Sequence, residues 1–334
     1  MLFFRTRAEG KYGWGNLARL SWIAKYFNEN ENTRCYFIIE GGEKSKKYIK
    51  DLGFEILICK KNISINEEIK LLKNFNFKIN IIVEMLDFYY EHQLNYRNQN
   101  FNVVILDDLL EQRYCSNVII CGQEHTYQKP EIIKEKYTKF YYGYDYFPMN
   151  PLLKISYKSF EKKINHKKNI GVFLGGVPYS IALLKIAKSL MDFESFLDIN
   201  FVIGYGKCSF LKEQINKFLP EANIYDTVNV KEYLSNLDYA IVGGGYSKIE
   251  AYLYKIPSII VSTQYHQIPL AETFSIKTNQ QHLGHVYYLN NKSISAHISE
   301  LVINNSKNIN YNLLKKLDNS FEKTVNIIKK ELRL

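Results

Sequence analysis

The stretch Tyr239-Ala-Ile-Val-Gly-Gly-Gly-Tyr-Ser-Lys-Ile-Glu250 places three consecutive glycines between an apolar run and a helical pattern. The run Tyr239–Val242 is short and apolar, as is typical of a strand that is buried on both faces of a sheet. Ser247 opens the helical pattern, and serine is a preferred residue at helix N-caps. A glycine-rich turn from a buried strand into a helix is typical of phosphate-binding loops. This stretch therefore predicts a parallel α/β fold.

Apolar runs and helical patterns alternate on both sides of this stretch. In the first half we predict strands at Leu2–Thr6, Arg34–Ile39, Glu55–Ile58, Ile79–Glu84, Val103–Leu106 and Val118–Ile120, and helices at Asn16–Phe27, Lys44–Leu52, Asn66–Phe75 and Tyr89–Asn98. In the second half we predict strands at Ile170–Leu174, Phe201–Ile203, Tyr239–Val242 and Ser258–Val261, and helices at Tyr179–Met191, Phe210–Phe218, Ser247–Tyr254 and Pro269–Lys277. This alternation predicts parallel sheets that are covered by helices on both faces.

The alternation lapses between Asp145 and Lys168, and we interpret that segment as a linker between two domains. A length of 334 residues fits this division. We predict a Rossmann-like domain over residues 1–150 and a second Rossmann-like domain over residues 151–310. A long amphipathic helix is expected over residues 311–334. Ligands of doubly wound sheets lie beyond the carboxyl ends of the strands, so we expect the two sheets to face a central cleft.

The composition excludes several classes of protein. A hydrophobic fraction of 46% is too high for a disordered chain. The net charge of +10 suits phosphate-bearing substrates, an anionic membrane surface or nucleic acid, but no nucleic-acid motif is present, so no nucleic-acid partner is expected. The five cysteines contain no Cys-x-x-Cys pair, and neither a disulfide framework nor a metal site is predicted. No stretch is long enough to span a membrane and the first residues do not resemble a signal peptide. We expect a cytoplasmic protein, with peripheral association at the inner face of the membrane left open.

Three loops have the glycines that a phosphate site needs. Glycine lets the backbone approach a phosphate closely, and the N–H groups that open the next helix favour an anion. One such loop is as often only a tight turn, but three in one chain favour a phosphate-bearing ligand. The loops contain, in chain order, Gly13 and Gly15 before a helix that carries Arg19; Gly175 and Gly176 before Pro178; and Gly243, Gly244 and Gly245.

Glu250 lies one turn beyond the third loop. A carboxylate at this position can accept hydrogen bonds from both hydroxyls of a ribose while the loop holds the phosphate. The alternative is that Glu250 only stabilises the first turn of its helix. The segment Gly13–Ala18 also matches a dinucleotide fingerprint, with Glu40 at about the right distance. Residues Arg7–Tyr12, many of them polar, separate that fingerprint from its strand, which makes a nicotinamide or flavin enzyme the less favoured interpretation.

At these loops the chain resembles the PseG/SpsG group of UDP-sugar hydrolase-like proteins, which has the GT-B fold and is related to MurG-type glycosyltransferases. The resemblance is carried by Arg7-Ala8, Gly13-Trp14-Gly15-Asn16 with Arg19, Phe173-Leu174-Gly175-Gly176, Gly243–Glu250 and His266-Gln267. It implies that the domain over residues 1–150 binds sugar or acceptor and that the domain over residues 151–310 binds the nucleotide. The residues it implies for the substrate are Arg7, Gly13, Gly15, Arg19, His266 and Gln267. It also implies that the nucleotide is bound by Gly175, Gly176, Gly243, Gly244, Gly245, Ser247 and Glu250. Beyond the nucleotide-sugar substrate, no cofactor is expected.

The chain departs from this group at Asn16, where the hydrolases carry a histidine that activates water. A carboxamide cannot accept a proton near neutral pH, so general-base help worth roughly 10²–10⁴-fold would be missing. Asn16 could still orient a hydroxyl. The other candidates for a base are Asp107 with its neighbour Asp108, His125, and Glu84 or Asp87 at the end of the strand Ile79–Glu84. Asp107 can equally cap a turn, and a histidine in the setting of His125 is more often a surface residue than a base.

We therefore predict a GT-B glycosyltransferase. It would pass a sugar, of the pseudaminic-acid or diacetamido type, from a nucleotide donor to a hydroxyl of a glycan or protein in bacterial surface-glycan or flagellin modification. A UDP-sugar hydrolase that finds its base elsewhere is the first alternative. A catalytically silent nucleotide-sugar-binding subunit is the second.

Overall fold

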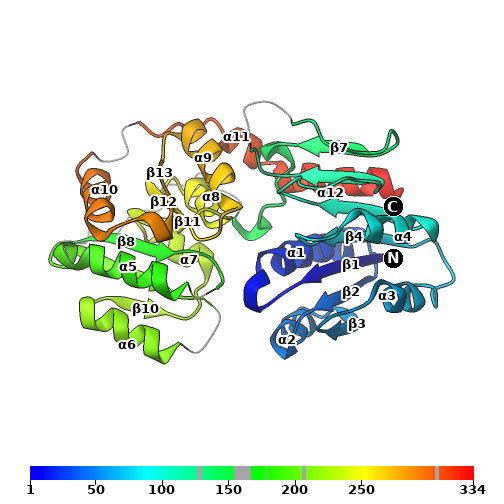
Figure 1. Ribbon diagram of the computed structural model, residues 1–334, viewed down its shortest axis with the longest axis horizontal. Helices are drawn as coiled ribbons and strands as arrows, with labels where there is room; N and C mark the ends of the chain where they lie inside the picture. Colours follow the sequence, from blue (N-terminus) through cyan, green and yellow to red (C-terminus); the bar gives the residue numbers. More distant parts are fainter. Residues whose placement is uncertain (126–129, 154–166, 178, 205–207, 305–307) are drawn as a thin grey trace. The chain divides into compact units, whose positions relative to one another are not determined.

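The structure, a computed structural model, describes residues 1–125, 130–153, 167–177, 179–204, 208–304 and 308–334. It divides into two compact units (Figure 1). The first domain comprises Met1–Pro151 and Lys315–Leu334, and the second comprises Leu152–Leu314. Residues 154–166 of the expected linker, and Pro178 of the second glycine loop, lie outside the described residues.

The first domain is built on a parallel sheet with the strand order β3-β2-β1-β4-β5-β6-β7. Its strands are β1 (Leu2–Arg7), β2 (Cys35–Glu40), β3 (Glu55–Lys60), β4 (Asn80–Glu84), β5 (Asn102–Leu106), β6 (Val118–Cys121) and β7 (Lys139–Tyr142). Its helices are α1 (Gly15–Asn30), α2 (Glu43–Asp51), α3 (Ile65–Leu72), α4 (Tyr90–Asn98) and α12 (Ser320–Leu332), and the short α11 (Leu314–Leu317) begins at its boundary. The strand order reverses between β1 and β4, so the carboxyl ends of these strands are where a ligand site is expected.

Alternate side chains of β1 face two separate cores. Leu2 and Phe4 pack with α1 and α12, whereas Phe3 packs with residues of α3 and α4 on the opposite face. Because the strand is covered on both faces, its consecutive residues Leu2, Phe3 and Phe4 are all apolar, whereas the buried Arg5 is paired with Glu68.

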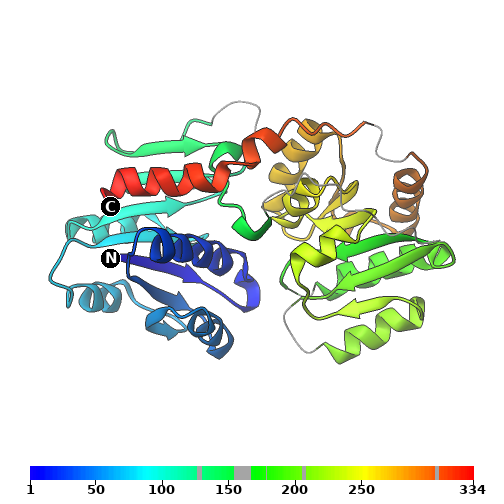
Figure 2. The same cartoon turned by 180° about the vertical axis from the view of Figure 1, so that it is seen from behind.

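The C-terminal segment belongs to the first domain, and the expectation of one continuous helix over residues 311–334 is wrong. Helix α11 ends at Leu317 and α12 begins at Ser320, whose hydroxyl donates to the Leu317 carbonyl oxygen at 2.7 Å. The residues between them are aspartate and asparagine, which favour turns over helix interiors. Figure 2 shows α12 beside α1, and the rings of Phe321 and Tyr26 lie 5.9 Å apart.

Phe321→Ala is expected to destabilise the first domain by about 3–5 kcal/mol, because it removes a buried aromatic ring and leaves a cavity. The side chain of Phe321 is only 3% exposed. Chemical denaturation followed by tryptophan fluorescence measures the change, since Trp14 and Trp22 pack against the same core. Unchanged stability would mean that α12 does not pack against this core.

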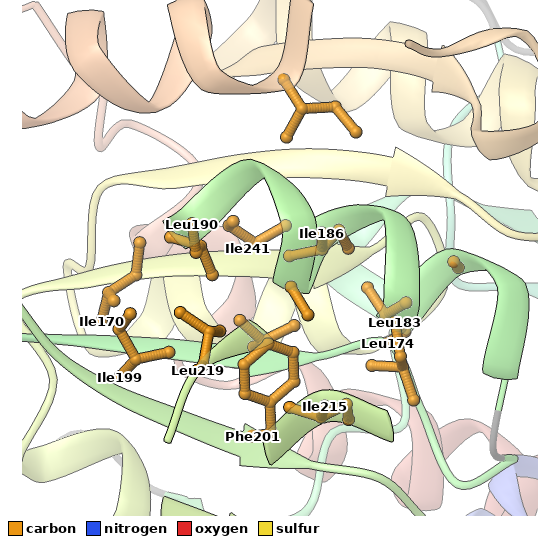
Figure 3. Packing of buried hydrophobic residues seen from close by; sticks show 14 of the residues in the cluster. Ile170, Leu174, Leu183, Ile186, Leu190, Ile199, Phe201, Ile215, Leu219 and Ile241 are labelled. Carbon is orange, nitrogen blue, oxygen red and sulfur yellow. The ribbon is translucent and has the colours of Figure 1, made fainter. Parts of the chain in front are cut away.

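The second domain has a parallel sheet with the strand order β10-β9-β8-β11-β12-β13. Its strands are β8 (Lys168–Phe173), β9 (Leu197–Val202), β10 (Asn223–Tyr225), β11 (Tyr239–Gly243), β12 (Ser258–Ser262) and β13 (Gln281–His285). Its helices are α5 (Ser180–Leu190), α6 (Ser209–Phe218), α7 (Val230–Ser235), α8 (Ser247–Leu253), α9 (Gln267–Thr278) and α10 (Asn291–Asn304). Its core places Ile170, Ile199 and Ile241 of the sheet against Ile186 of α5 and Ile215 of α6 (Figure 3). The strand order reverses between β8 and β11.

The prediction of two doubly wound, Rossmann-like parallel sheets is confirmed, but three edge strands were not predicted. β7 and β10 end their sheets, and β13 ends the second sheet on its other side. An edge strand pairs with a neighbour on one side only, so these three strands are only partly buried. Their sequences are Lys139-Phe-Tyr-Tyr142, Asn223-Ile-Tyr225 and Gln281-His-Leu-Gly-His285. Such strands lack the continuous apolar run that identified the inner ones. No helix within the described ranges combines the length and the apolar character needed to cross a bilayer.

Candidate functional site

The third glycine loop lies at the carboxyl end of β11, where its backbone meets the end of β8. A Cβ atom at Gly243 would lie 2.3 Å from the carbonyl oxygen of Leu174. A Cβ atom at Gly244 would lie 2.8 Å from the hydroxyl of Ser262 and 3.1 Å from the Cβ of Gln267. Only glycine fits at Gly243, because the clash is with backbone, whereas a side chain at Gly244 would have to displace the Ser262 hydroxyl. The loop therefore packs between the ends of β8 and β12.

The second glycine loop meets a further glycine that sequence reasoning missed. Gly175 has a φ of 120°, which favours glycine, and Gly204 after β9 has a φ of 95°. A Cβ atom at Gly204 would lie 2.9 Å from the carbonyl oxygen of Gly176. The only sequence signal for the role of Gly204 was its position as a single glycine at the end of a predicted strand. The loops after β8, β9 and β11 therefore converge at the point where the strand order of the second domain reverses.

Glu250 lies in the first turns of α8, where it has the features of a ligand-binding carboxylate. Its side chain is half-buried, and among the described residues no hydrogen bond or ion pair engages its carboxylate. Burial raises the pKa of Glu250 to about 7. Keeping an unpaired carboxylate partly buried costs free energy, and such groups are enriched at functional sites.

The predicted N-cap at Ser247 is wrong by one residue. Helix α8 begins at Ser247 and Tyr246 occupies the N-cap position, with no side-chain cap. The backbone of Tyr246 is already helical, with φ −71° and ψ −30°, so the first helical turn starts one residue before Ser247.

His266 and Gln267 lie at the start of α9, next to the third loop. His266 is the N-cap residue of α9. The side-chain oxygen of Gln267 accepts from the backbone N–H of Thr263 at 3.0 Å, and its amide nitrogen lies 3.6 Å from where a Cβ of Gly245 would be. Gln267 thus fixes the turn between β12 and α9 against the third loop.

In the first domain, the charged residues at the ends of β1 and β2 engage one another. Arg7 forms ion pairs with Glu40 and Asp87, and its guanidinium lies 5.2 Å from the ring centroid of Tyr12. Glu40 also accepts from the backbone N–H of Ile63 at 3.1 Å. Because Glu40 is held by these partners, it does not present a free carboxylate to a ribose, and the dinucleotide interpretation loses its support. Gly13, with a φ of 69°, closes the first loop, and Gly15 opens α1.

Arg19 brings together residues that are far apart in the sequence. Its guanidinium donates to Asp108 Oδ2 at 2.7 Å and to Asn16 Oδ1 at 3.0 Å, and it forms an ion pair with Glu84. Burial lowers the pKa of Arg19 to about 10, so it remains charged at neutral pH. Burial, followed by the charge of Asp108, raises the pKa of Glu84 well above its usual range. Arg19, predicted to bind substrate, thus organises this cluster and occupies the side-chain oxygen of Asn16.

Asp107 is a buried carboxylate whose two oxygens are engaged by neighbouring donors. Oδ1 accepts from the backbone N–H of Leu109 at 2.8 Å, and Oδ2 accepts from Gln112 Nε2 at 2.9 Å and from the Tyr114 hydroxyl at 2.8 Å. This is the turn-capping arrangement that the sequence left open. Because both carboxylate oxygens are already engaged, Asp107 is poorly placed to act as a base that contacts a substrate.

Asp107→Ala is expected to cost about 3 kcal/mol of unfolding free energy, because it leaves buried donors such as the Tyr114 hydroxyl unpaired. Chemical denaturation checks the loss. The matched control is Asp51→Ala, which breaks an exposed pair with Lys47 and should change stability by about 0.5 kcal/mol or less. Normal stability with selective loss of activity would instead assign Asp107 a catalytic role.

His125 lies close to Asp108. Its backbone N–H donates to the Tyr142 hydroxyl at 2.9 Å, and its Nε2 lies 3.8 Å from the Cys121 sulfur. Burial lowers the pKa of His125 against the opposing charge of Asp108. The imidazole is therefore neutral at pH 7 and can accept a proton. Within the ranges that the structure describes, no three His, Cys, Asp or Glu side chains gather closely enough to hold a metal ion.

No protein-family model matches this chain. An uncharacterised protein of Methanocaldococcus jannaschii is 23% identical over 314 residues, which cover 88% of this chain and 63% of that protein. The spore coat polysaccharide biosynthesis protein SpsG of Bacillus subtilis is 26% identical over 142 residues, or 41% of this chain and 42% of SpsG. The chain therefore spans less than two thirds of the length of these curated relatives.

Solved structures identify the architecture as the GT-B fold. MurG of Acinetobacter baumannii superposes with a TM-score of 0.66 at 12% identity, covering 98% of this chain and 99% of MurG. S. aureus MnaA, in a co-structure with UDP, gives 0.65 at 10% identity and covers 100% of this chain and 97% of MnaA. The spinosyn rhamnosyltransferase SpnG, complexed with thymidine diphosphate, gives 0.65 at 8% identity, with 100% of both chains covered.

Proposed function

We propose that this protein is a glycosyltransferase that takes its sugar from a nucleoside diphosphate donor, with UDP as the preferred nucleotide. The observation that carries the proposal is Glu250, a half-buried carboxylate with raised pKa that lies one turn beyond the glycine loop of β11. A carboxylate there can accept from the two hydroxyls of a ribose. Solved proteins of the same fold bind UDP and thymidine diphosphate, which supports a nucleotide at this position.

Transfer is favoured over hydrolysis by the residue at position 16. The side-chain oxygen of Asn16 already accepts a hydrogen bond from Arg19, and a carboxamide cannot act as a base near neutral pH. His125, neutral and close to Asp108, is the candidate that could accept the proton of an acceptor hydroxyl. Asp107 is better explained as a structural residue.

The acceptor and the pathway are the finer part of the proposal. The similarity to a spore coat polysaccharide biosynthesis protein supports a role in surface-glycan formation, with a glycan or protein hydroxyl as acceptor. A sugar of the pseudaminic-acid or diacetamido type follows from the resemblance to the PseG-like group. The net charge of +10 suits a cytoplasmic enzyme that associates peripherally with an anionic membrane face.

The experiment is a panel of UDP, TDP and CMP, and of their sugars, screened by thermal unfolding and isothermal titration calorimetry. A ligand that binds only the folded state stabilises it by about 2.7 kcal/mol at 100 times its Kd. Stabilisation by UDP with sugar release only in the presence of an acceptor supports the transferase. Nucleotide release in water alone would establish the hydrolase, and binding without turnover the silent subunit. If no nucleotide stabilises the protein, the proposal is wrong.

A further inference from the structure

Lys248 is a buried lysine in the first turn of α8, and its ammonium group lies against the third glycine loop. Nζ donates to the carbonyl oxygen of Gly244 at 2.7 Å and to that of Gly245 at 2.9 Å. The same nitrogen lies 5.6 Å from the ring centroid of Phe274. Lys248 is 0% exposed. Burying a lysine costs free energy unless its ammonium group has polar partners. The two loop carbonyl oxygens supply those partners, and the lysine in turn holds them in place.

The two hydrogen bonds fix the orientation of two successive peptide groups. In a trans peptide, the C=O and N–H groups point in opposite directions. The carbonyl of Gly244 shares its peptide with the N–H of Gly245, and the carbonyl of Gly245 shares its peptide with the N–H of Tyr246. Both carbonyls point toward Lys248, so both N–H groups point away from it. Successive N–H groups directed to one side form a surface that binds anions.

The charge of Lys248 also reaches its surroundings. Burial, with the charge of Lys248 as the second cause, lowers the pKa of His282 to about 4. His282 is therefore neutral at pH 7 and bonds to the Ser262 hydroxyl at 2.9 Å. A positive charge thus lies immediately behind the loop, on the side opposite to the two N–H groups, and Glu250 follows half a turn later on the same helix.

We propose that Lys248 is a positioning residue for the diphosphate of the donor: it turns the N–H groups of Gly245 and Tyr246 toward the phosphate oxygens and places a positive charge behind them. This inference rests on the proposed function and adds to it the residue that distinguishes a nucleoside diphosphate from the uncharged nucleoside. Since Lys248 is buried behind the loop, it acts through the backbone and through its field, without contacting the ligand.

The test compares three ligands on the full chain: uridine, UDP and inorganic pyrophosphate, titrated by calorimetry. Lys248→Met removes the charge and both hydrogen bonds, and Lys248→Gln keeps an N–H donor but removes the charge. We expect Lys248→Met to weaken UDP and pyrophosphate by about tenfold or more and to leave uridine affinity within about twofold. Lys248→Gln should give an intermediate loss. The matched control, Lys231→Met on the exposed face of α7, should leave all three affinities unchanged.

Each outcome decides the inference. A selective loss for the phosphate-bearing ligands supports it, whereas equal losses for uridine and UDP, or unchanged affinities, overturn it. If neither variant folds, Lys248 has a purely structural role and the inference is also overturned. Failure of the proposed function differs, because the wild-type protein then binds no nucleoside diphosphate, while pyrophosphate still reports whether Lys248 governs anion binding. A wild-type protein that binds none of the three ligands overturns both.

Discussion

Replacing Glu250 by glutamine is expected to weaken uridine and UDP binding by about 30-fold and to stabilise the ligand-free protein above pH 7. Hydrogen bonds to a charged acceptor are worth about 1 kcal/mol more each than those to a neutral one, and a ribose offers two hydroxyls, so about 2 kcal/mol is lost. Calorimetry of both ligands measures the loss. Uridine is the cleaner probe, since it carries no phosphate that titrates in the same range.

The effect of Glu250→Gln on stability follows from linkage. Burial raises the pKa of Glu250 from its ordinary value of 4.5 to about 7. Between these values the folded state binds more protons than the unfolded state, so this group lowers stability as pH rises through that window. Glutamine does not titrate, so the variant should be more stable than the wild type above pH 7 and similar to it near pH 4. For the same reason, the wild-type affinity for uridine should rise as pH rises through about 7, and that of the variant should stay flat.

This combination of weaker ligand binding and higher stability distinguishes loss of a ribose contact from general destabilisation of the fold. The control is Glu272→Gln on the exposed face of α9, which should change neither quantity. If Glu250→Gln leaves uridine affinity unchanged, Glu250 does not bind the ribose. A variant that is less stable at every pH would assign the carboxylate a structural role.

Asn16→His is expected to raise nucleotide release in water, without acceptor, by about 10²–10⁴-fold, the range that a positioned general base supplies. The guanidinium of Arg19 lies 3.0 Å from the present side-chain oxygen of Asn16. A neighbouring cation disfavours a charged imidazole, so the new histidine should be neutral and basic near pH 7. The measurement is nucleotide release from the donor that the ligand panel identifies, followed against pH, with the rate rising as the histidine loses its proton.

Asn16→Gln is the matched control, because it keeps a carboxamide and changes only its reach. No gain from histidine and no difference between the two variants would mean that position 16 does not determine whether water is the acceptor. A high rate of release by the wild type itself would show that a base is already present, and His125 would then be the first residue to test.

The sequence was sufficient where a local pattern carries the information. Strand β11 could be predicted because a buried central strand is apolar. The loop Gly243–Gly245 could be predicted because Gly243 lies too close to the backbone of Leu174 for any side chain. The edge strands β10 and β13 could not be predicted, because a strand with one free edge tolerates polar residues such as Asn223 and Gln281. In the candidate site, Gly204 gave only a weak signal because a lone glycine after a strand is common.

By itself, the sequence determined the doubly wound architecture of the two domains and the glycine loop Gly243–Gly245 that precedes Glu250, since apolar periodicity and glycine placement act over a few residues. Only the tertiary structure decided the roles of the charged groups. Arg19 meets Glu84 and Asp108 because α1 begins at the edge of the sheet where β4 and β5 end. Lys248 bonds to the carbonyl oxygens of its loop because a buried charge needs polar partners. The partners of a buried charge come from segments that are far apart in the sequence. Only the folded structure therefore shows which charged residues pair and what role each one has.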